Sequence, residues 1–304
     1  MLFRDLEYFL VLSEHRHFGR AADALGLSQP ALSKSVRRLE EFAETALCER
    51  SARGMTLTPA GRVLIERARL ILRDAGRAFE EVKSVHGELK GTVKIGAIPT
   101  VCETFLPAAL QRLRQARTGV TASVMSNWNQ SLFAMLDAGE VDLIITGLKE
   151  PSNNSRYNCQ PLFHDRVSVV CRAGHPLDLK KPASLKEVQK FEWVLASATS
   201  AGRQWLDETF SAHKLPRPRV AIESDSLILA KELVAASNLL GFLPRLVVAG
   251  DIASGRLRPV GTRAGIEWNR TIYMLTLSKP PLSVSARLLI SYLRDVARTI
   301  RPGN

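Results

Sequence analysis

The stretch FGRAADALGLSQPALSKSVRRLE, Phe18 to Glu40, decides the fold of the N-terminal region. Small and apolar side chains between Ala21 and Leu25 predict a short helix that packs closely on its neighbours, and Gly26 ends it. Ser28 can cap the next helix with its hydroxyl, and Pro30 fits a first turn because its missing N–H has no partner there. The stretch therefore predicts two helices joined by a glycine-containing turn.

The second of these helices has an apolar face and a polar face. The apolar face is formed by Leu32, Val36 and Leu39. The opposite face carries amide, hydroxyl and cationic groups and no acid, and its members are Gln29, Ser33, Lys34 and Arg37. This arrangement is typical of a helix-turn-helix that reads the major groove of DNA. A generic three-helix bundle with a solvated face is the alternative interpretation.

The residues on either side of these two helices favour the DNA-binding interpretation. Apolar residues from Phe3 through Leu6, Phe9 and Leu10 to Ser13 recur at three- and four-residue spacing, which predicts a preceding helix. On the other side, residues 50–61 read as a wing. Its short turn holds Arg50, Arg53 and Gly54 and could place cations against flanking phosphates.

Residues 18–40, followed by Glu49-Arg-Ser and Leu57-Thr-Pro-Ala-Gly61, resemble the LysR-type transcriptional regulators. The resemblance covers the whole chain and is strongest over residues 1–65. It implies a winged helix-turn-helix over residues 1–58. One departure is the segment 42–48, where the family usually has a leucine, a glycine and an aromatic residue. The predicted DNA-binding residues are Arg20, Ser28, Gln29, Pro30, Ser33, Lys34, Arg37, Arg50 and Arg53.

The overall net charge of +12 contributes little to this interpretation. Residues 1–65 hold nine Lys and Arg against eight Asp and Glu, so only the placement of the cations favours DNA binding. Residues 91–304 hold 27 Lys and Arg against 17 Asp and Glu. That surplus suits an anionic small molecule, and surface solubility explains it equally well.

Residues 59–90 predict a long linker helix, because no proline follows Pro59 until Pro99. Apolar and small residues alternate spacings of four and three along it, as in the seam of a coiled coil. The seam consists of Leu64, Ala68, Ile71, Ala75, Ala78, Val82, Val85 and Leu89. We expect a homodimer through this seam, and the family resemblance implies an antiparallel helix pair and a tetramer. Packing of the seam on the chain's own C-terminal domain is the alternative.

From residue 91 onward, strand-like and helix-like runs alternate, which indicates an α/β domain with parallel strands. Strands are expected at 93–98, 120–125, 142–145, 167–171, 194–196, 220–222, 241–243 and 270–277. Helices are expected at 103–114, 130–138, 203–210, 227–236 and 284–300. The resemblance implies a periplasmic-binding-protein-like effector domain. Subdomain I would span 91–161 and 266–304, and subdomain II 162–265.

Such sheets bind ligands beyond the carboxyl ends of their strands, where loops meet helix N-termini. The candidate effector residues found there are Thr100, Asn129, Thr146, Ser197, Thr199, Ser200 and Phe242. Each hydroxyl alone is as readily a helix cap or turn former, and their recurrence at strand ends favours a cleft. The predicted function is a sequence-specific DNA-binding regulator whose promoter binding is modulated by a small anionic effector.

Cysteine and histidine placement suggests only one further alternative. The four cysteines, Cys48, Cys102, Cys159 and Cys171, include no C-x-x-C pair, so reduced structural thiols are expected. A redox switch joining Cys159 to Cys171 is the alternative function. The six histidines show no metal-ligand spacing, and no metal or other cofactor is predicted.

Other protein classes fit less well. An α/β enzyme lacks support because the chain has no G-x-G-x-x-G after a strand, no Walker loop and no G-x-S-x-G elbow. A solute receptor of a transporter would be exported, whereas residues 1–12 lack the features of a signal peptide. No apolar run approaches the roughly 18 residues of a membrane span. We therefore expect a cytoplasmic protein with no membrane partner.

Overall fold

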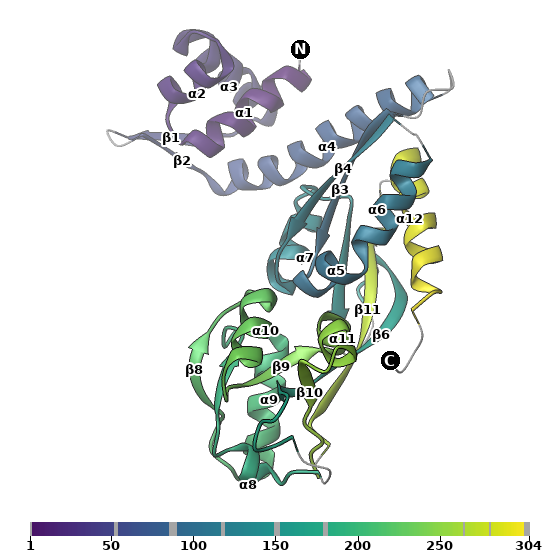
Figure 1. The fold of residues 1–304 in the computed structure, drawn as a ribbon. Coiled ribbons are helices and arrows are strands. Elements are labelled where there is room, and N and C mark those ends of the chain that lie inside the picture. Colours follow the sequence, from purple (N-terminus) through teal and green to yellow (C-terminus); the bar gives the residue numbers. More distant parts are fainter. Residues whose placement is uncertain are drawn as a thin grey trace.

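A computed structural model describes residues 2–51, 54–84, 90–116, 119–148, 153–178, 182–263, 265–279 and 281–300. An N-terminal domain is joined through one long helix to a two-part C-terminal domain (Figure 1). The N-terminal elements are α1 (Leu2–His15), α2 (Phe18–Leu25), α3 (Gln29–Ala43), β1 (Cys48–Ser51), β2 (Gly54–Leu57) and the long helix α4 (Pro59–Ser84).

The predicted end of α2 and start of α3 are confirmed by their caps, whereas α2 begins at Phe18, earlier than the predicted Ala21. Gly26 ends α2 in the left-handed conformation, with φ 63°. Ser28 caps α3 by accepting a hydrogen bond from the backbone N–H of Ala31 at 3.3 Å. His17 caps α2, because its Nδ1 accepts the backbone N–H of Gly19 at 3.1 Å. The sequence thus fixes the turn between the two helices by local hydrogen bonds.

The hairpin of β1 and β2 is held against the N-terminal helices by two glycines. Gly54 has φ +128°, and a Cβ there would lie 2.6 Å from the carbonyl oxygen of Arg16. The next residue, Met55, donates its backbone N–H to that oxygen at 2.9 Å. A Cβ at Gly61 would lie 2.0 Å from the carbonyl oxygen of Leu47. Only glycine allows either approach.

The predicted apolar stripe of the first helix is partly wrong. Leu6 and Phe9 are buried as expected, whereas Phe3 is 55% exposed. Leu12 fills the core position that the stripe had assigned near Ser13, whose hydroxyl instead donates to the carbonyl of Leu10. The 3.6-residue period of the helix places residues 6, 9 and 12–13 on one side, and the larger apolar side chain is the one that packs.

Residues 42–48, which depart from the usual family pattern, contain the end of α3 and its cap. Glu44 caps α3 with φ 52°, the left-handed conformation that favours glycine. Phe42 is 77% exposed. Glu40 compensates by accepting the backbone N–H of Leu47 at 2.9 Å, which secures the base of the hairpin.

The apolar seam of helix α4 has two parts. The first part packs within this chain, and the later part is available to another chain. Leu64 and Ala68 pack into the core of the N-terminal domain. Ile71 is 44% exposed and Val82 is 63% exposed. Intrachain packing therefore accounts for the start of the predicted seam, and its later part is uncovered within this chain. Val85 and Leu89 lie outside the described residues.

The same helix also rests on the C-terminal domain. Arg69 Nη1 lies 3.1 Å from Glu140 Oε1, and Arg73 Nη1 donates to the carbonyl of Val141 at 3.1 Å. Leu70 packs against the neighbouring hydrophobic core, close to Gly139. One face of α4 is thus seated on the turn between α7 and β5.

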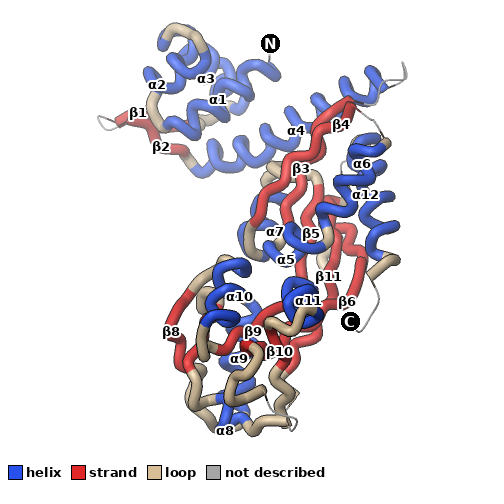
Figure 2. Tube along the Cα trace, viewed as in Figure 1, coloured by secondary structure: helices blue, strands red, loops and turns tan. Residues whose placement is uncertain are grey.

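The C-terminal elements alternate as expected (Figure 2). The first group is β3 (Lys90–Ala97), α5 (Pro99–Thr104), α6 (Leu106–Gln115), β4 (Gly119–Ser126), α7 (Asn129–Asp137), β5 (Leu143–Leu148) and β6 (Tyr157–Arg172). The second group is α8 (Leu185–Val188), β7 (Glu192–Leu195), α9 (Ala201–Ala212), β8 (Arg219–Glu223), α10 (Leu227–Ala236), β9 (Leu240–Pro244), α11 (Arg245–Ala253) and β10 (Leu257–Pro259). The chain then returns through β11 (Glu267–Leu277) to α12 (Val284–Ala297).

The sheet is mixed, which corrects the expectation of parallel strands. Its order is β4-β3-β5-β11-β6-β9-β7-β8, with β10 paired to β6. The pairs β3–β4, β3–β5, β7–β8 and β7–β9 are parallel. The central pairs made by β6 and β11 are antiparallel, because these two strands carry the chain across and back.

The two strands β6 and β11 serve both halves of the domain. Phe163 on β6 and Ile272 on β11 belong to the core that also contains β3, β5, α6 and α12. Further along β6, Val169 and Cys171 belong to the core around Trp193 and α9. We call the first half subdomain I and the second subdomain II. Two continuous strands therefore connect them.

Two further expectations needed correction. The helix expected at 103–114 is two helices, α5 and α6, which meet at Phe105. Pro107 lies in the first turn of α6, and its ring is incompatible with an uninterrupted helix through this point. The first half of β6 and the whole of α11 were not expected from the sequence.

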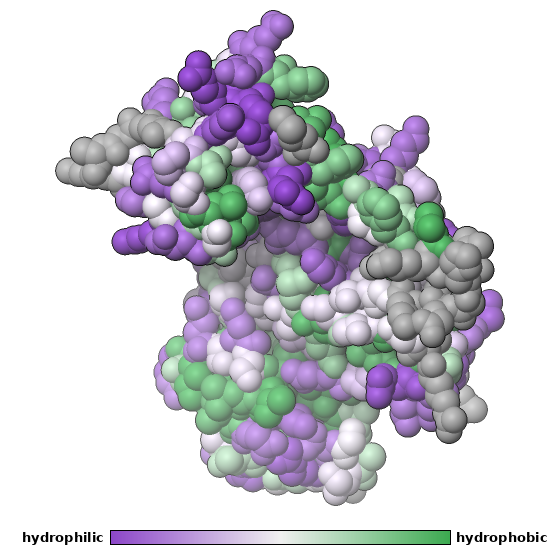
Figure 3. Space-filling model, turned by 90° about the horizontal axis from the view of Figure 1, so that it is seen from above, coloured by the Kyte–Doolittle hydropathy of each residue, from purple (hydrophilic) through white to green (hydrophobic). Residues whose placement is uncertain are grey.

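The surface seen from the end that carries the N-terminal domain is mixed (Figure 3). Strongly hydrophilic residues gather over part of it, and hydrophobic residues form smaller separate groups. Among the helices that the structure describes, none has the length and apolarity needed to cross a membrane.

Candidate functional site

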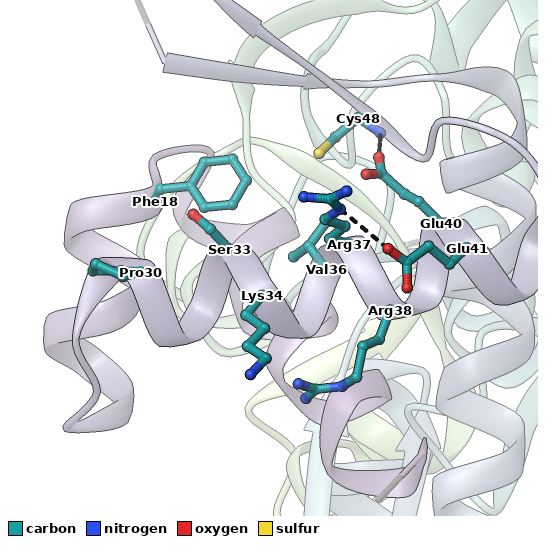
Figure 4. Close-up of a pocket in the computed structure, with 10 residues that line it drawn as sticks. All are labelled: Phe18, Pro30, Ser33, Lys34, Val36, Arg37, Arg38, Glu40, Glu41 and Cys48. Atoms are coloured by element: carbon teal, nitrogen blue, oxygen red, sulfur yellow. Dashed lines mark hydrogen bonds and ion pairs between the residues drawn. The ribbon is translucent and has the colours of Figure 1, made fainter.

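Helix α3 forms one side of a shallow groove of about 690 Å³ on the N-terminal domain (Figure 4). The groove is lined by Phe18, Pro30, Ser33, Lys34, Val36, Arg37, Arg38, Glu40, Glu41 and Cys48. Four of the predicted DNA-binding residues, Pro30, Ser33, Lys34 and Arg37, are among them. The structure thus brings these four together along one helix.

The other predicted residues lie around this groove. Gln29 is exposed at the start of α3, and Arg20 is exposed on α2. Ser28 is also exposed, although its hydroxyl is engaged as the helix cap. The backbone of Arg50 lies in β1, and Arg53 lies outside the described residues.

The polar face of α3 is not free of acids beyond its first turns, which corrects the sequence interpretation. Arg37 Nε lies 3.1 Å from Glu41 Oε1, one turn further along the helix. Both side chains are well exposed, so the pair adds little stability and competes only weakly with a phosphate for the guanidinium. The acid-free part of the face is limited to residues 29–37.

A buried carboxylate fixes α3 against α1. Asp5 is 3% exposed, and its Oδ1 accepts the hydroxyl of Ser35 at 2.6 Å. Arg38 forms an ion pair with the same carboxylate and donates from Nε to Oδ2 at 3.2 Å. Burial opposes the charged form of Asp5, yet the hydrogen bonds from Arg38 and Ser35 outweigh it and lower its pKa. Sequence reasoning missed this pair, which orients the exposed face of α3.

A second candidate site is a cleft of about 300 Å³ between the subdomains. It lies where strands of subdomain I end and where α7 and α9 begin, as the strand-end argument predicts. The residues that line it are Ile98, Asn127, Trp128, Asn129, Gln130, Ser131, Gly147, Thr199, Ser200, Ala201, Gly202, Trp268 and Arg270. Asn129, Thr199 and Ser200 of the predicted set are among them.

Three other predicted residues support the cleft from behind. Thr146 donates its hydroxyl to Asn129 Oδ1, and Asn129 Nδ2 donates to the carbonyl of Gly147 at 3.1 Å. Thr100 is 3% exposed and accepts a hydrogen bond from Arg270. The hydroxyl of Ser197 lies 3.2 Å from that of Thr199. These side chains position groups that reach the cleft.

Phe242 is placed elsewhere. Its ring stacks on Trp205 with centroids 5.7 Å apart and an interplanar angle of 2°. It packs against the core of subdomain II and is not among the cleft-lining residues. The expected apolar wall is supplied instead by Trp128, Trp268 and Ile98.

The central cation of the cleft, Arg270, was missed from the sequence. It is 8% exposed and forms an ion pair with Asp165, with Nη2 2.7 Å from Oδ2. Its Nη2 also donates to Thr100 Oγ1 at 3.1 Å. The guanidinium carbon lies 5.3 Å from the centre of the Trp268 ring. An arginine at the start of the strand expected at 270–277, most of which is apolar, was the signal that could have revealed it.

The two cysteines of the redox alternative lie far apart in this fold, and all four cysteines are free. Cys159 and Cys171 both lie on β6, where they pair with Leu275 and Arg258 respectively. Twelve residues of strand separate their Cα atoms by roughly 40 Å, far beyond disulfide reach. Cys171 is fully buried, and burial raises the pKa of its thiol to about 12. Within the described residues, no group of three or more potential ligands could hold a metal ion.

Two family profiles match the chain. The profile described as "Bacterial regulatory helix-turn-helix protein, lysR family" matches residues 3–62. The profile described as "LysR substrate binding domain" matches residues 86–298. The matches coincide with the helix α3 region and with the two subdomains that enclose the cleft.

Similar characterised proteins carry regulator names. The HTH-type transcriptional regulator GalR of Pseudomonas putida is 32% identical over 84% of this chain but only 64% of its own length. The SDS degradation transcriptional activation protein of a Pseudomonas sp. is 33% identical over 90% of this chain and 88% of its own. The hydrogen peroxide-inducible genes activator of Haemophilus influenzae is 28% identical over 100% of this chain and 99% of its own.

Solved full-length structures share the whole architecture. OxyR from Pseudomonas aeruginosa is 26% identical, with a TM-score of 0.71 over 98% of this chain and 94% of that one. CbnR complexed with its target DNA is 21% identical, with a TM-score of 0.66 over 97% of this chain and 100% of that one, and this likeness shows the fold alone. From the two profiles and these relatives, the chain belongs to the LysR family of DNA-binding transcriptional regulators with an effector-binding domain.

Proposed function

We propose that this regulator binds a small anionic effector in the cleft and that the effector alters its promoter binding. The observation that carries the proposal is the position of Arg270, a buried cation at the wall of the cleft between the subdomains. Asp165 engages Nε and Nη2 of this guanidinium. No hydrogen bond of Nη1 to another described residue is found, so Nη1 is available to an anion.

Two helix N-termini add to the attraction for an anion. Residues 129–131 begin α7 in subdomain I, and residues 201–202 begin α9 in subdomain II, and both segments line the cleft. Helix α7 has no side-chain cap, so its first N–H groups are open to a ligand. The partial positive charge of a helix N-terminus favours a carboxylate or similar group. An effector touching both would favour one arrangement of the subdomains.

Helix α7 offers a route from the cleft to the DNA-binding domain. It starts at Asn129 in the cleft and ends about 13 Å away, next to the turn that contacts α4. At that turn, Glu140 and Val141 bond to Arg69 and Arg73 of α4. A shift of α7 on effector binding would therefore move the helix that carries the N-terminal domain.

We further propose that the regulator binds DNA as a dimer, through the α3 helices of two chains. The uncovered part of α4, with Ile71, Ala78 and Val82 on one side, would pair with a second chain. A dimer would present two copies of α3, so the operator should be a pseudo-palindrome with half-sites spaced by whole helical turns. We also propose that the regulator assembles into a tetramer, as its likeness to the LysR-type regulators implies.

The test is thermodynamic linkage between the two ligands. A footprint on the intergenic region beside the gene locates the operator. Operator affinity and bend are then measured with and without candidate carboxylates. We expect a bound carboxylate to change operator affinity, and operator DNA to change carboxylate affinity by the same factor. A carboxylate that binds in the cleft without changing affinity, bend or footprint would contradict the proposal.

The redox alternative has less support. It needs Cys159 and Cys171 to meet, whereas β6 holds them far apart and Cys171 is fully buried. The name of the Haemophilus influenzae relative refers to that protein's inducer. The cleft with Arg270 is the feature that best supports a function here.

A further inference from the structure

We propose that the effector is an aromatic carboxylate with a single ring, held with its ring against Trp128 and Trp268 and its carboxylate at Arg270. The inference rests on the proposed function and narrows the chemistry of the ligand. It starts from the distribution of the four tryptophans in the chain.

The tryptophans divide into two pairs. Trp193 is fully buried in the core of subdomain II, and Trp205 packs against the same core. Trp128 and Trp268 line the cleft, and neither belongs to one of the four hydrophobic clusters of the described residues, although Trp268 is only 7% exposed. Large aromatic side chains on the wall of a cavity are typical of ligand contacts. These two indoles therefore define an aromatic wall.

The aromatic wall and the cation meet at one place. The guanidinium carbon of Arg270 lies over the Trp268 ring, 5.3 Å from its centre. A ligand whose ring contacts the indoles can place an anionic substituent at the same guanidinium. An aromatic carboxylate joins these two features within a few bonds, whereas an aliphatic acid uses only one of them.

Two glycines keep this arrangement open. A Cβ at Gly147 would lie 2.8 Å from Arg270 Cδ, and a Cβ at Gly202 would lie 3.3 Å from the Trp268 ring. Both glycines line the cleft, one from each subdomain. Side chains at these positions would push on the arginine or the indole, so the wall depends on their absence.

The size of the cavity limits the ligand. Its volume of about 300 Å³ is at the small end of the range for small-molecule sites. One aromatic ring with a short acidic substituent fits that volume better than a fused-ring compound. Ser131 and Thr199 line opposite sides of the cleft and could bond ring substituents such as hydroxyl groups.

The experiment measures binding to the full-length protein by calorimetry and by quenching of tryptophan fluorescence. The probes are benzoate, phenylacetate and cinnamate. Cyclohexanecarboxylate and succinate are non-aromatic controls, and benzamide is the neutral control. We expect the tightest of the aromatic acids to bind about fivefold or more tightly than cyclohexanecarboxylate, with quenching, and benzamide not to bind.

Substitutions assign the binding to the aromatic wall. Trp128→Leu and Trp268→Leu should each weaken the best aromatic acid about fivefold and leave succinate unchanged. The matched control is Trp205→Phe, which alters an indole outside the cleft and should leave all affinities unchanged. Thermal unfolding of each variant identifies any general loss of folding, and the comparison of the two acids within one variant is independent of it.

The outcomes separate this inference from the proposed function. If succinate or cyclohexanecarboxylate binds as tightly as the aromatic acids, the inference is wrong, and the proposed function, binding of an anionic effector, is retained. If benzamide matches benzoate, or if no carboxylate binds at millimolar concentrations, both are overturned. Unchanged aromatic affinity in both tryptophan variants would also overturn the inference.

Discussion

Asp165 and Arg270 face each other across β6 and β11, with carboxylate Oδ2 2.7 Å from guanidinium Nη2. The pair is buried between the two subdomains, and Asp165 is 5% exposed. Replacing one partner leaves the other as an uncompensated buried charge. We predict that Asp165→Ala lowers the free energy of unfolding by about 3 to 5 kcal/mol, measured by urea denaturation.

A double variant separates the stability of this pair from its function. Asp165→Leu with Arg270→Met replaces both charges by apolar groups and should recover most of the lost stability. Because it lacks the cation, it should no longer respond to a carboxylate effector. Equal stability of the single and double variants would contradict this account.

Glu44 ends α3 in a conformation that suits glycine. We predict that Glu44→Gly raises the free energy of unfolding of the N-terminal domain by about 1 kcal/mol, because it relieves left-handed strain. Thr45→Gly is the matched control, since the φ of Thr45 is not positive, and it should not stabilise. Thermal unfolding measures both, and equal shifts in the two variants would refute the explanation.

The stability of subdomain II should depend on the protonation of His175. Its Nδ1 accepts the backbone N–H of Leu177 at 2.9 Å, and burial lowers its pKa below 6.5. The unfolded chain therefore binds this proton more readily than the folded protein. The stability is fully present above pH 6.5 and is lost as the pH falls below that value toward the folded-state pKa.

The measurement is the urea midpoint as a function of pH. His175→Gln should lower the midpoint at high pH and flatten the profile between neutral and mildly acidic conditions. The control His213→Gln changes an exposed histidine and should preserve the slope. An unchanged slope in His175→Gln would show that other groups cause the pH dependence.

The start of α3 should determine sequence preference. Gln29→Ala combined with Ser33→Ala should relax discrimination between operator and altered sites, because each well-made base contact contributes about 1 to 3 kcal/mol. Arg53→Ala should instead weaken binding to every sequence and lessen its salt dependence. Operator competition assays at several salt concentrations distinguish the two classes. Preserved sequence preference in the double variant would rule out this reading surface.

The uncovered part of α4 should hold the dimer together. Val82→Glu places a charge in the expected helix pair and should shift the protein toward monomers in sedimentation velocity. Val63→Glu is the control, because Val63 is also exposed but lies about 80° around the helix from Ile71. Dissociation by both variants, or by neither, would place the interface elsewhere.

Local signals in the sequence were sufficient for much of the fold. The caps at Gly26 and Ser28 are set by residues within one turn, so the end of α2 and the start of α3 were predicted correctly. The bounds of α10 were predicted as observed. In contrast, the antiparallel course of β6 and β11 depends on pairing between residues 99 to 120 positions apart, and no local pattern records it.

The residues of the cleft also divide into those that local sequence predicts and those that depend on long-range pairing. Asn129, Thr199 and Ser200 were predicted because they follow strands directly. Arg270 and Trp268 were missed because their position depends on the register of β11 against β6. Phe242 was assigned to the cleft from its strand position, but its ring turns toward Trp205 instead. Strand ends predict where a site lies, and the pairing register decides which side chains reach it.

The continuity of β6 and β11 has a mechanical consequence. A loop hinge opens by rotating a few backbone bonds, whereas a pair of hydrogen-bonded strands resists bending and yields mainly by twisting. The register shift between Ile272 and Tyr273, opposite Pro161, interrupts the regular pairing of this ribbon, and proline provides no N–H to the ladder. We therefore expect the subdomains to respond to an effector by a small twist about this point, and not by the wide rotation that a loop hinge allows.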